Sequence, residues 1–210
     1  MEYLFSALIG YLLGSIPAAY LIVKRVNKLD ITKEGSGNVG ALNSFEISKS
    51  KLIGLTVLII DLLKGLSSVL IPIFIFPGEF GYPAVGLFFS VFGHCYNPWL
   101  EFKGGRGLAT AAGGAIIIFP LLLILWCVLW VIFYLMKKNI HFANISSTVF
   151  SLLVVFGISD IAIKYAFPQP VNESTLIMIC SSVLILIFVR HIEPLKQYLV
   201  EQKSNWKIKK

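Results

Sequence analysis

Charged residues and cysteines are both scarce in this sequence. Only 14% of its 210 residues are charged, and its three cysteines are Cys95, Cys127 and Cys180. All three lie in apolar runs and their number is odd, which is typical of buried thiols that pack as small hydrophobic side chains. We therefore expect neither a disulfide framework nor a zinc site, and we predict no metal site and no cofactor.

The sequence also lacks a polar stretch long enough to fold by itself. The longest such stretch, Lys24–Lys51, has 28 residues. Hydrophobic residues make up 57% of the chain, and its mean hydropathy is +0.82. Several apolar runs approach or exceed the about 18 residues that cross a bilayer. We therefore expect an all-α polytopic membrane protein with a single integral-membrane domain, residues 1–210. The first apolar run has no basic segment before it and no obvious cleavage site, so we expect a retained span rather than a signal peptide.

The positive charge of the chain is concentrated in two places. The formal net charge is +7, with six Lys or Arg residues in Lys24–Lys51 and six more from Arg190 onward. Cytoplasmic loops of membrane proteins collect Lys and Arg, whereas the turn Pro77–Tyr82 has no basic residue. The charge therefore indicates topology. Because no soluble face is large enough to bind nucleic acid, we expect no nucleic-acid partner.

The apolar runs predict a path through the membrane. Leu108–Met136 is too long for one crossing and too short for two full ones, and Lys137-Lys138 should be cytoplasmic. We therefore split this run near Pro120 into two short helices. The result is about seven transmembrane segments, some short or broken, with the N-terminus outside and the C-terminus cytoplasmic. The other segments are expected at about Tyr3–Val23, Leu52–Phe76, Pro83–Trp99, Ser146–Phe167 and Thr175–Val189.

Four residues inside these segments carry information about packing or function. Pro17 should kink the first segment. Asp61 and Lys64 lie three residues apart on one face of the second segment, where a mutual ion pair and a functional site are both open. His94, near the end of the third segment, is more typical of a hydrogen-bonded packing residue than of a catalyst.

A glycine-rich loop, Gly35–Asn43, separates the first two apolar runs. Its three glycines lie within six residues, so its backbone amides can converge into a nest that binds phosphate. Ser36, Asn38 and Asn43 add side-chain donors. An ordinary glycine-rich membrane loop is the alternative interpretation.

A second glycine-rich loop, Lys103–Gly107, leads into the apolar run that starts at Leu108. The N-terminus of a helix attracts anions through its free amides and its dipole. The predicted topology puts both glycine-rich loops on the cytoplasmic face, together with Lys137–Asn144 and Arg190-His191. We therefore predict a phosphate-binding active face in the cytoplasm.

These motifs, in this order and spacing, resemble the bacterial membrane acyl-phosphate:glycerol-3-phosphate acyltransferases. The resemblance runs from Gly14 to about Leu195. It rests on Gly14-Ser15-Ile16-Pro17, Gly35 to Asn43, Asp61-Leu62-Leu63-Lys64-Gly65, Gly93-His94, Pro98, Phe102-Lys103-Gly104-Gly105-Arg106-Gly107-Leu108-Ala109-Thr110, and Arg190-His191.

The resemblance implies a seven-segment enzyme of the bacterial cell membrane. It implies acyl transfer from a fatty acyl phosphate to the 1-hydroxyl of glycerol 3-phosphate, giving lysophosphatidic acid for phospholipid synthesis. The family uses no metal and takes the acyl group directly from neither coenzyme A nor acyl carrier protein. It has no obvious side-chain base, and the acceptor's own phosphate is thought to take the proton. The expected partners are therefore the acyl phosphate donor, the glycerol 3-phosphate acceptor and membrane lipid.

The resemblance also implies site residues. The implied catalytic residues are Ser36, Arg106 and His191. The first glycine-rich loop should hold the acyl-phosphate group. The implied substrate-binding residues are Gly37, Asn38, Gly40, Asn43, Lys103, Gly104, Gly105, Gly107 and Thr110.

The chain departs from the family pattern mainly on the acceptor side. Glu46 stands where the family has Arg, Arg106 replaces Lys, and Pro194 replaces Asn, while His141 aligns with a serine. Two alternatives follow: a paralogue that acylates a different acceptor, and a non-catalytic membrane protein that binds lipid or acyl phosphate. Transport ranks last, because the segments show no obvious repeat.

Overall fold

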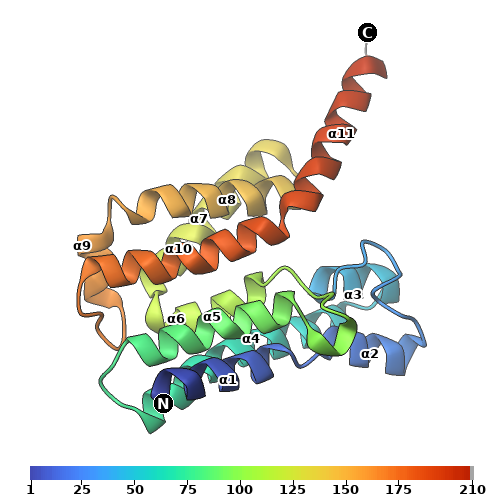
Figure 1. Ribbon diagram of the computed structural model, residues 1–210. Helices are drawn as coiled ribbons and strands as arrows, with labels where there is room; N and C mark the ends of the chain where they lie inside the picture. The colour runs from blue at the N-terminus through green and yellow to red at the C-terminus, as the bar shows by residue number, and fades with distance from the viewer. Residues whose placement is uncertain (209–210) are drawn as a thin grey trace.

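The computed structural model describes residues 1–208, and within that range the chain is helical with no β-strand (Figure 1). The elements are α1 (Glu2–Gly14), α2 (Ala18–Asn27), α3 (Ala41–Ser48), α4 (Lys51–Ile75), α5 (Gly81–Cys95), η1 (Pro98–Leu100), α6 (Leu108–Ile118), α7 (Pro120–Lys137), α8 (Ile140–Val155), α9 (Ser159–Ala162), η2 (Ile163–Tyr165), α10 (Glu173–Arg190) and α11 (Ile192–Ile208).

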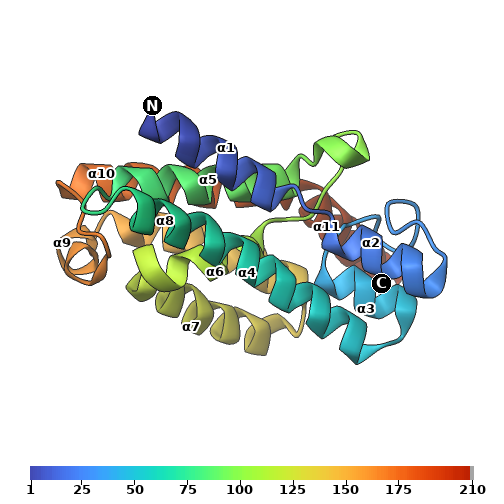
Figure 2. The same cartoon turned by 90° about the horizontal axis from the view of Figure 1, so that it is seen from below.

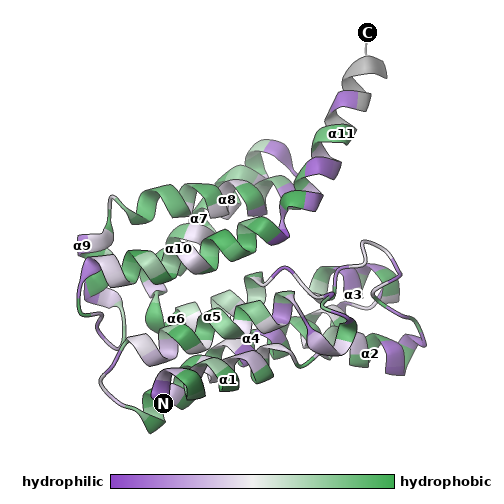
Figure 3. Ribbon diagram, in the orientation of Figure 1, coloured by the Kyte–Doolittle hydropathy of each residue, from purple (hydrophilic) through white to green (hydrophobic). Residues whose placement is uncertain are grey.

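The long helices form two groups that meet along α5 and α10. In the first group, α5 packs against α1, α4 and α6, and in the second, α8 packs against α7 and α10. The short helices α2 and α3 lie side by side against α4 at one end of the bundle, near the start of α11, whereas the N-terminus and α9 lie at the other end (Figures 1 and 2). Hydrophilic residues gather around α2, α3 and α11, and hydrophobic residues cover the long helices (Figure 3).

The described chain has four helical stretches that are long and apolar enough to cross a membrane, and a fifth if a bent pair counts as one span. The four are Glu2–Asn27, Lys51–Ile75, Pro120–Lys137 and Glu173–Arg190, and the bent pair joins α8 to Ser159–Tyr165 at 88°. The expectation of an all-α polytopic membrane protein is confirmed. The count of seven segments and the orientation of the termini stay predictions.

Two of the helix breaks lie at prolines. The split near Pro120 is confirmed: α6 ends at Ile118, and α7 begins with Pro120 at its first position, where the missing N–H costs no hydrogen bond. At Pro17 the helix is interrupted rather than only kinked: it ends at Gly14 and restarts at Ala18, and both parts belong to one candidate span.

Glycine brings α4 and α6 into close contact. A Cβ on Gly65 would meet the carbonyl of Thr110, and one on Gly113 would meet the carbonyl of Leu62, so the two backbones touch where any side chain would separate them. Near this contact, Lys64 Nζ lies 2.7 Å from Asp61 Oδ1, and both residues are buried. The ion-pair interpretation of these two residues is therefore confirmed.

Candidate functional site

A polar pocket lies between the two glycine-rich loops, the end of α10 and the first turns of α11. Six of the residues expected from the sequence line it together. Three come from the first glycine-rich loop and three from the second, although about sixty residues separate the loops in the chain. The six are Ser36, Gly37, Asn38, Lys103, Gly104 and Arg106, and the remaining lining residues are Phe102, Val189, Arg190, Glu193, Pro194 and Gln197.

The first loop is organised by the side chain of Asn43. This residue is only 1% exposed. Its Oδ1 accepts a hydrogen bond from the N–H of Ser36 at 3.1 Å, and its Nδ2 donates to the carbonyls of Glu34 and Asn38 at 3.1 and 3.0 Å. Asn43 was expected as a donor to a ligand. In the structure its amide holds the turn from beneath, and it does not line the pocket.

Two of the glycines in this loop are required by the backbone. Gly35 and Gly37 have φ values of +59° and +67°, in the left-handed region that L side chains rarely adopt. Gly40 is different, because its backbone is extended and it caps the N-terminus of α3. The turn that presents Ser36, Gly37 and Asn38 to the pocket therefore depends on glycine at 35 and 37.

The second loop is held between the end of α5 and Arg190. The N–H of Gly105 donates to the carbonyl of His94 at 3.0 Å. On the other side, Arg190 donates to the carbonyls of both Gly104 and Gly105 at 3.2 Å. A Cβ on Gly105 would collide with Nε2 of His94. Gly105 therefore supports the loop from beneath rather than lining the pocket.

Helix α6 begins directly after this loop. Its N-cap, Gly107, has a φ of +84° and no side chain to bond the first amides of the helix, so these amides can meet an anion. Thr110 in the first turn is fully buried against α4, and its Oγ1 has no hydrogen-bond partner among the described residues. Thr110 thus lies at a helix contact and not in the pocket.

Arg106 lies among several charged or titratable side chains. Its Nη1 is 3.3 Å from Nδ1 of His141, and because a guanidinium can only donate, His141 accepts this contact. Burial lowers the pKa of Arg106, Arg190 lowers that pKa further, and Glu46 acts in the opposite direction. Glu46 on α3 is therefore close enough to act on the guanidinium that lines the pocket.

His191 is only 1% exposed and does not line the pocket. Its Nδ1 lies 2.8 Å from the carbonyl of Ile187, which can only accept, so Nδ1 carries the proton. Burial, together with the nearby Arg106, His141 and Arg190, lowers the pKa of His191 to about 4, although its hydrogen bond to the carbonyl of Ile187 raises that pKa. The ring is therefore neutral at pH 7. Its Nε2 is left as an acceptor with no partner within residues 1–208.

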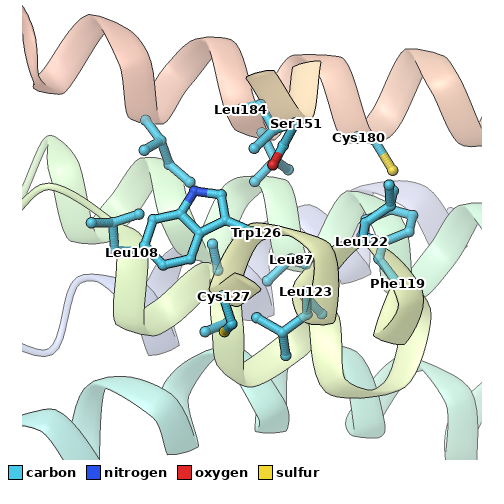
Figure 4. A pocket seen from close by; sticks show the side chains of 15 residues that line it. Leu87, Leu108, Phe119, Leu122, Leu123, Trp126, Cys127, Ser151, Cys180 and Leu184 are labelled. Carbon is cyan, nitrogen blue, oxygen red and sulfur yellow. The ribbon is translucent and has the colours of Figure 1, made fainter. Parts of the chain in front are cut away.

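A second cavity is apolar and lies next to the polar pocket along the chain; Figure 4 shows the side chains that line it. The two share chain segments, since Leu108 lines the cavity two residues after Arg106, and Ile187 lines it three residues before Arg190. The lining side chains come from α5, α6, α7, α8 and α10. They are Leu87, Leu108, Ala111, Ala112, Ala115, Phe119, Leu122, Leu123, Trp126, Cys127, Ser151, Cys180, Val183, Leu184 and Ile187.

Six of the pocket residues were not among the expected site residues, and Arg190, Glu193 and Gln197 are the polar ones. Arg190 belongs to a motif that the sequence analysis noted, but only His191 was selected from it. Glu193 and Gln197 lie four apart on α11, in a stretch that was interpreted as a basic tail. The spacing of four residues could have indicated that Glu193 and Gln197 act together, because it puts both side chains on one helical face. Within residues 1–208, no three His, Cys, Asp or Glu side chains gather as metal ligands.

Comparisons with known proteins give consistent results. Residues 4–201 match the profile of the family described as glycerol-3-phosphate acyltransferase. Relatives with that name occur in Ehrlichia canis (34% identical, 94% of each chain) and Pelagibacter ubique (33% identical, 99% of this chain and 100% of the relative). Two crystal structures of the integral membrane glycerol 3-phosphate acyltransferase PlsY are 30% identical and cover 96% of this chain. Its glycerol 3-phosphate form has a TM-score of 0.79 over 94% of that chain, and its lysophosphatidic acid form has 0.77 over 93%.

Proposed function

Because the chain belongs to the glycerol-3-phosphate acyltransferase family, it is a membrane enzyme that acylates glycerol 3-phosphate to lysophosphatidic acid, and we propose that the polar pocket is its active site. One observation carries the proposal. The two glycine-rich loops meet at one pocket, α6 begins two residues after Arg106 of that pocket, and Leu108 at its start lines an apolar cavity. An acyl donor that carries a phosphate needs this combination. We also propose that residues 1–210 form a single domain.

The proposed donor is a fatty acyl phosphate. Its phosphate would bind the first loop through the amides and side chains around Ser36, Gly37 and Asn38, and its chain would lie in the apolar cavity. The pocket also contains Lys103 and Arg106. Cations and backbone amides together compensate the charge of a phosphate better than either alone.

The proposed reaction needs positioning more than a strong base. The 1-hydroxyl oxygen of glycerol 3-phosphate attacks the acyl carbon, a C–O ester bond forms, and the bond from the acyl carbon to the phosphate oxygen breaks. Inorganic phosphate leaves, and the hydroxyl proton passes to a phosphate oxygen, as the family resemblance implies. An acyl phosphate is already activated, so the protein's part is orientation and stabilisation of the charge that develops on oxygen.

On the acceptor side, we propose that Arg106 binds the phosphate of glycerol 3-phosphate, with the N-terminus of α6 beside it. We keep Ser36 and His191 as proposed catalytic residues. His191 does not line the pocket, so its proposed role requires substrate to reach its buried Nε2, and its hydrogen bonding limits what that atom can bind. A neutral ring whose Nδ1–H bonds Ile187 can only accept at Nε2. Its proposed partner is therefore a glycerol hydroxyl or a protonated phosphate oxygen.

The test is a reconstituted reaction with purified full-length protein in detergent, palmitoyl phosphate and radiolabelled glycerol 3-phosphate. We expect labelled lysophosphatidic acid with palmitoyl phosphate, and none with palmitoyl coenzyme A or palmitoyl acyl carrier protein. Arg106→Ala serves as the inactive control. Product from coenzyme A alone would overturn the proposed donor. A protein that consumes palmitoyl phosphate but acylates only another alcohol would overturn the acceptor.

We further propose that the pocket faces the cytoplasm of the bacterial cell. The support is charge: the loop Lys24–Lys51 and the chain from Arg190 onward hold twelve of the eighteen Lys and Arg residues, and such residues stay on the cytoplasmic side. A cysteine-labelling experiment that tests this is given in the Discussion.

A further inference from the structure

We propose that Arg190 is a positioning residue that fixes both glycine-rich loops in one arrangement, so that it controls the binding of donor and acceptor together. This inference rests on the proposed function, which assigns one loop mainly to each substrate. The residue lines the polar pocket at the end of α10. Its role follows from its contacts with backbone rather than from its charge.

The first step in the argument is the geometry of two consecutive carbonyls. Nε of Arg190 donates to the oxygen of Gly105, and Nη2 donates to the oxygen of Gly104, each at 3.2 Å. A guanidinium presents these donors in a rigid planar fork, which an ammonium group cannot copy. Since the N–H of Gly105 is held by His94 on the opposite side, the peptide between Gly104 and Gly105 is fixed from both sides.

The second step is the connection to the other loop. The N–H of Val39 donates to the same Gly104 carbonyl that Arg190 bonds, with an N···O distance of 3.4 Å. Val39 directly follows the Gly37-Asn38 pair that lines the pocket. One carbonyl therefore joins the first loop, the second loop and α10. A shift of Gly104 should move both sides of the pocket.

The third step is that both Gly104 and the guanidinium of Arg190 are in close contact with the end of α5 and the residue after it. A Cβ on Gly104 would collide with the carbonyls of His94 and Cys95, so the loop lies directly on the end of α5. The guanidinium of Arg190 is itself held over the ring of Tyr96, 5.1 Å from its centroid. Among the side chains that the structure describes, Arg190 makes no ion pair with an acidic residue. Its described contacts are with carbonyls and one aromatic ring.

The competing explanation is that Arg190 binds the acceptor phosphate by charge alone. The two roles predict different behaviour for Arg190→Lys, which keeps the charge but loses the fork. A phosphate ligand should tolerate Lys and should affect only the acceptor. A positioning residue should not tolerate Lys, and its loss should affect both substrates.

The experiment measures initial rates with palmitoyl phosphate and glycerol 3-phosphate varied independently. For Arg190→Lys, we expect KM to rise about tenfold or more for each substrate. In the matched variant Arg106→Lys, we expect the KM for glycerol 3-phosphate alone to change. Wild-type kinetics in Arg190→Lys, or a KM change confined to glycerol 3-phosphate, would overturn the inference.

A second pair of variants and a binding measurement make the result interpretable even if Arg190→Lys does not fold. If Arg190→Lys does not give folded protein, Tyr96→Leu serves instead, because it removes the ring beneath the guanidinium and keeps an apolar side chain against Phe92. It should raise both KM values, whereas Tyr96→Phe, which keeps the ring, should match wild type. Unchanged KM values in folded Tyr96→Leu would then count against the inference.

Calorimetric binding of palmitoyl phosphate without acceptor separates the proposed function from the proposed role of Arg190. Wild type that binds no palmitoyl phosphate contradicts the proposed function, whereas equal binding by wild type and Arg190→Lys contradicts the role of Arg190.

Discussion

The substitution Glu46→Arg tests the acceptor side of the pocket most directly. Glu46 is an exposed residue of α3, and it acts electrostatically on Arg106, which lines the pocket. A carboxylate at this place repels an incoming phosphate and competes for the same guanidinium. Replacing it with arginine removes that repulsion and supplies a new cation. We therefore expect glycerol 3-phosphate to bind more tightly.

The expected gain in affinity for glycerol 3-phosphate is limited by the solvent exposure of residue 46. A hydrogen bond to a charged group contributes about 1.5–3 kcal/mol, and solvent screens contacts of exposed side chains. We take the lower end, about 1.5 kcal/mol, which corresponds to slightly more than tenfold in affinity. The KM for glycerol 3-phosphate should fall by about that factor. Glu46→Gln, which only removes the repulsion, should give a smaller decrease.

The assay is the rate of lysophosphatidic acid formation at saturating palmitoyl phosphate, repeated at low and high salt. The decrease in KM should shrink at high salt, because ions screen the exposed charge at residue 46. The control is Glu79→Arg, the same change of charge in the turn between α4 and α5, at the opposite end of the bundle (Figure 1). An unchanged or higher KM in Glu46→Arg would show that Glu46 lies outside the acceptor site or supports binding there.

Three further predictions address the donor, the topology and His191. Gly37→Leu should abolish binding of palmitoyl phosphate in calorimetry, because φ at this position is +67° and a side chain there is strained; normal binding by folded protein would exclude the first loop as the phosphate site. Single cysteines near Gly104 and Lys138 should react with membrane-impermeant thiol reagents only from the cytoplasm, and one near Gly78 only from outside; labelling near Lys138 from outside would overturn the seven-segment topology. The folded protein holds the pKa of His191 at about 4, below its ordinary value of 6.5. The neutral ring therefore contributes its full share of the free energy of unfolding above about pH 6.5. That share should be lost as the pH falls toward 4, by up to roughly 3 kcal/mol. His191→Asn should flatten the dependence of the unfolding midpoint on pH over that range, and equal slopes in both proteins would contradict the assigned protonation state.

The helix breaks show which parts of the fold the sequence could predict. Pro120 marked the boundary between α6 and α7 because the consequence of a missing N–H is local to the chain. Pro17 gave the position of the first break but not its extent. That extent depends on α2, which turns Lys24 and Arg25 away from the apolar core and packs against α3 and α4. These are tertiary contacts, which a single sequence does not reveal.

The site shows the same division between local and tertiary information. Both glycine-rich loops could be found from their spacing, and the structure brings Ser36 and Arg106 to one pocket. The orientation of Asn43 could not be predicted, because an amide satisfies carbonyls beneath a turn as readily as a ligand above it. Nor could the contacts of Arg190, whose carbonyl partners lie 85 and 86 residues away in sequence.

The shared boundary between the polar pocket and the apolar cavity has a consequence for turnover. On the proposed reaction, the two products have opposite solubilities. Inorganic phosphate can leave from the side of Arg106, which we propose faces the cytoplasm, while the new lipid keeps its chain beside Leu108 and Ile187 in the apolar cavity. The products then separate into two phases as they leave, and the reverse reaction would need both to return to the same boundary. Partitioning of the two products between water and membrane thus favours synthesis over the reverse reaction, and it requires no conformational change of the protein.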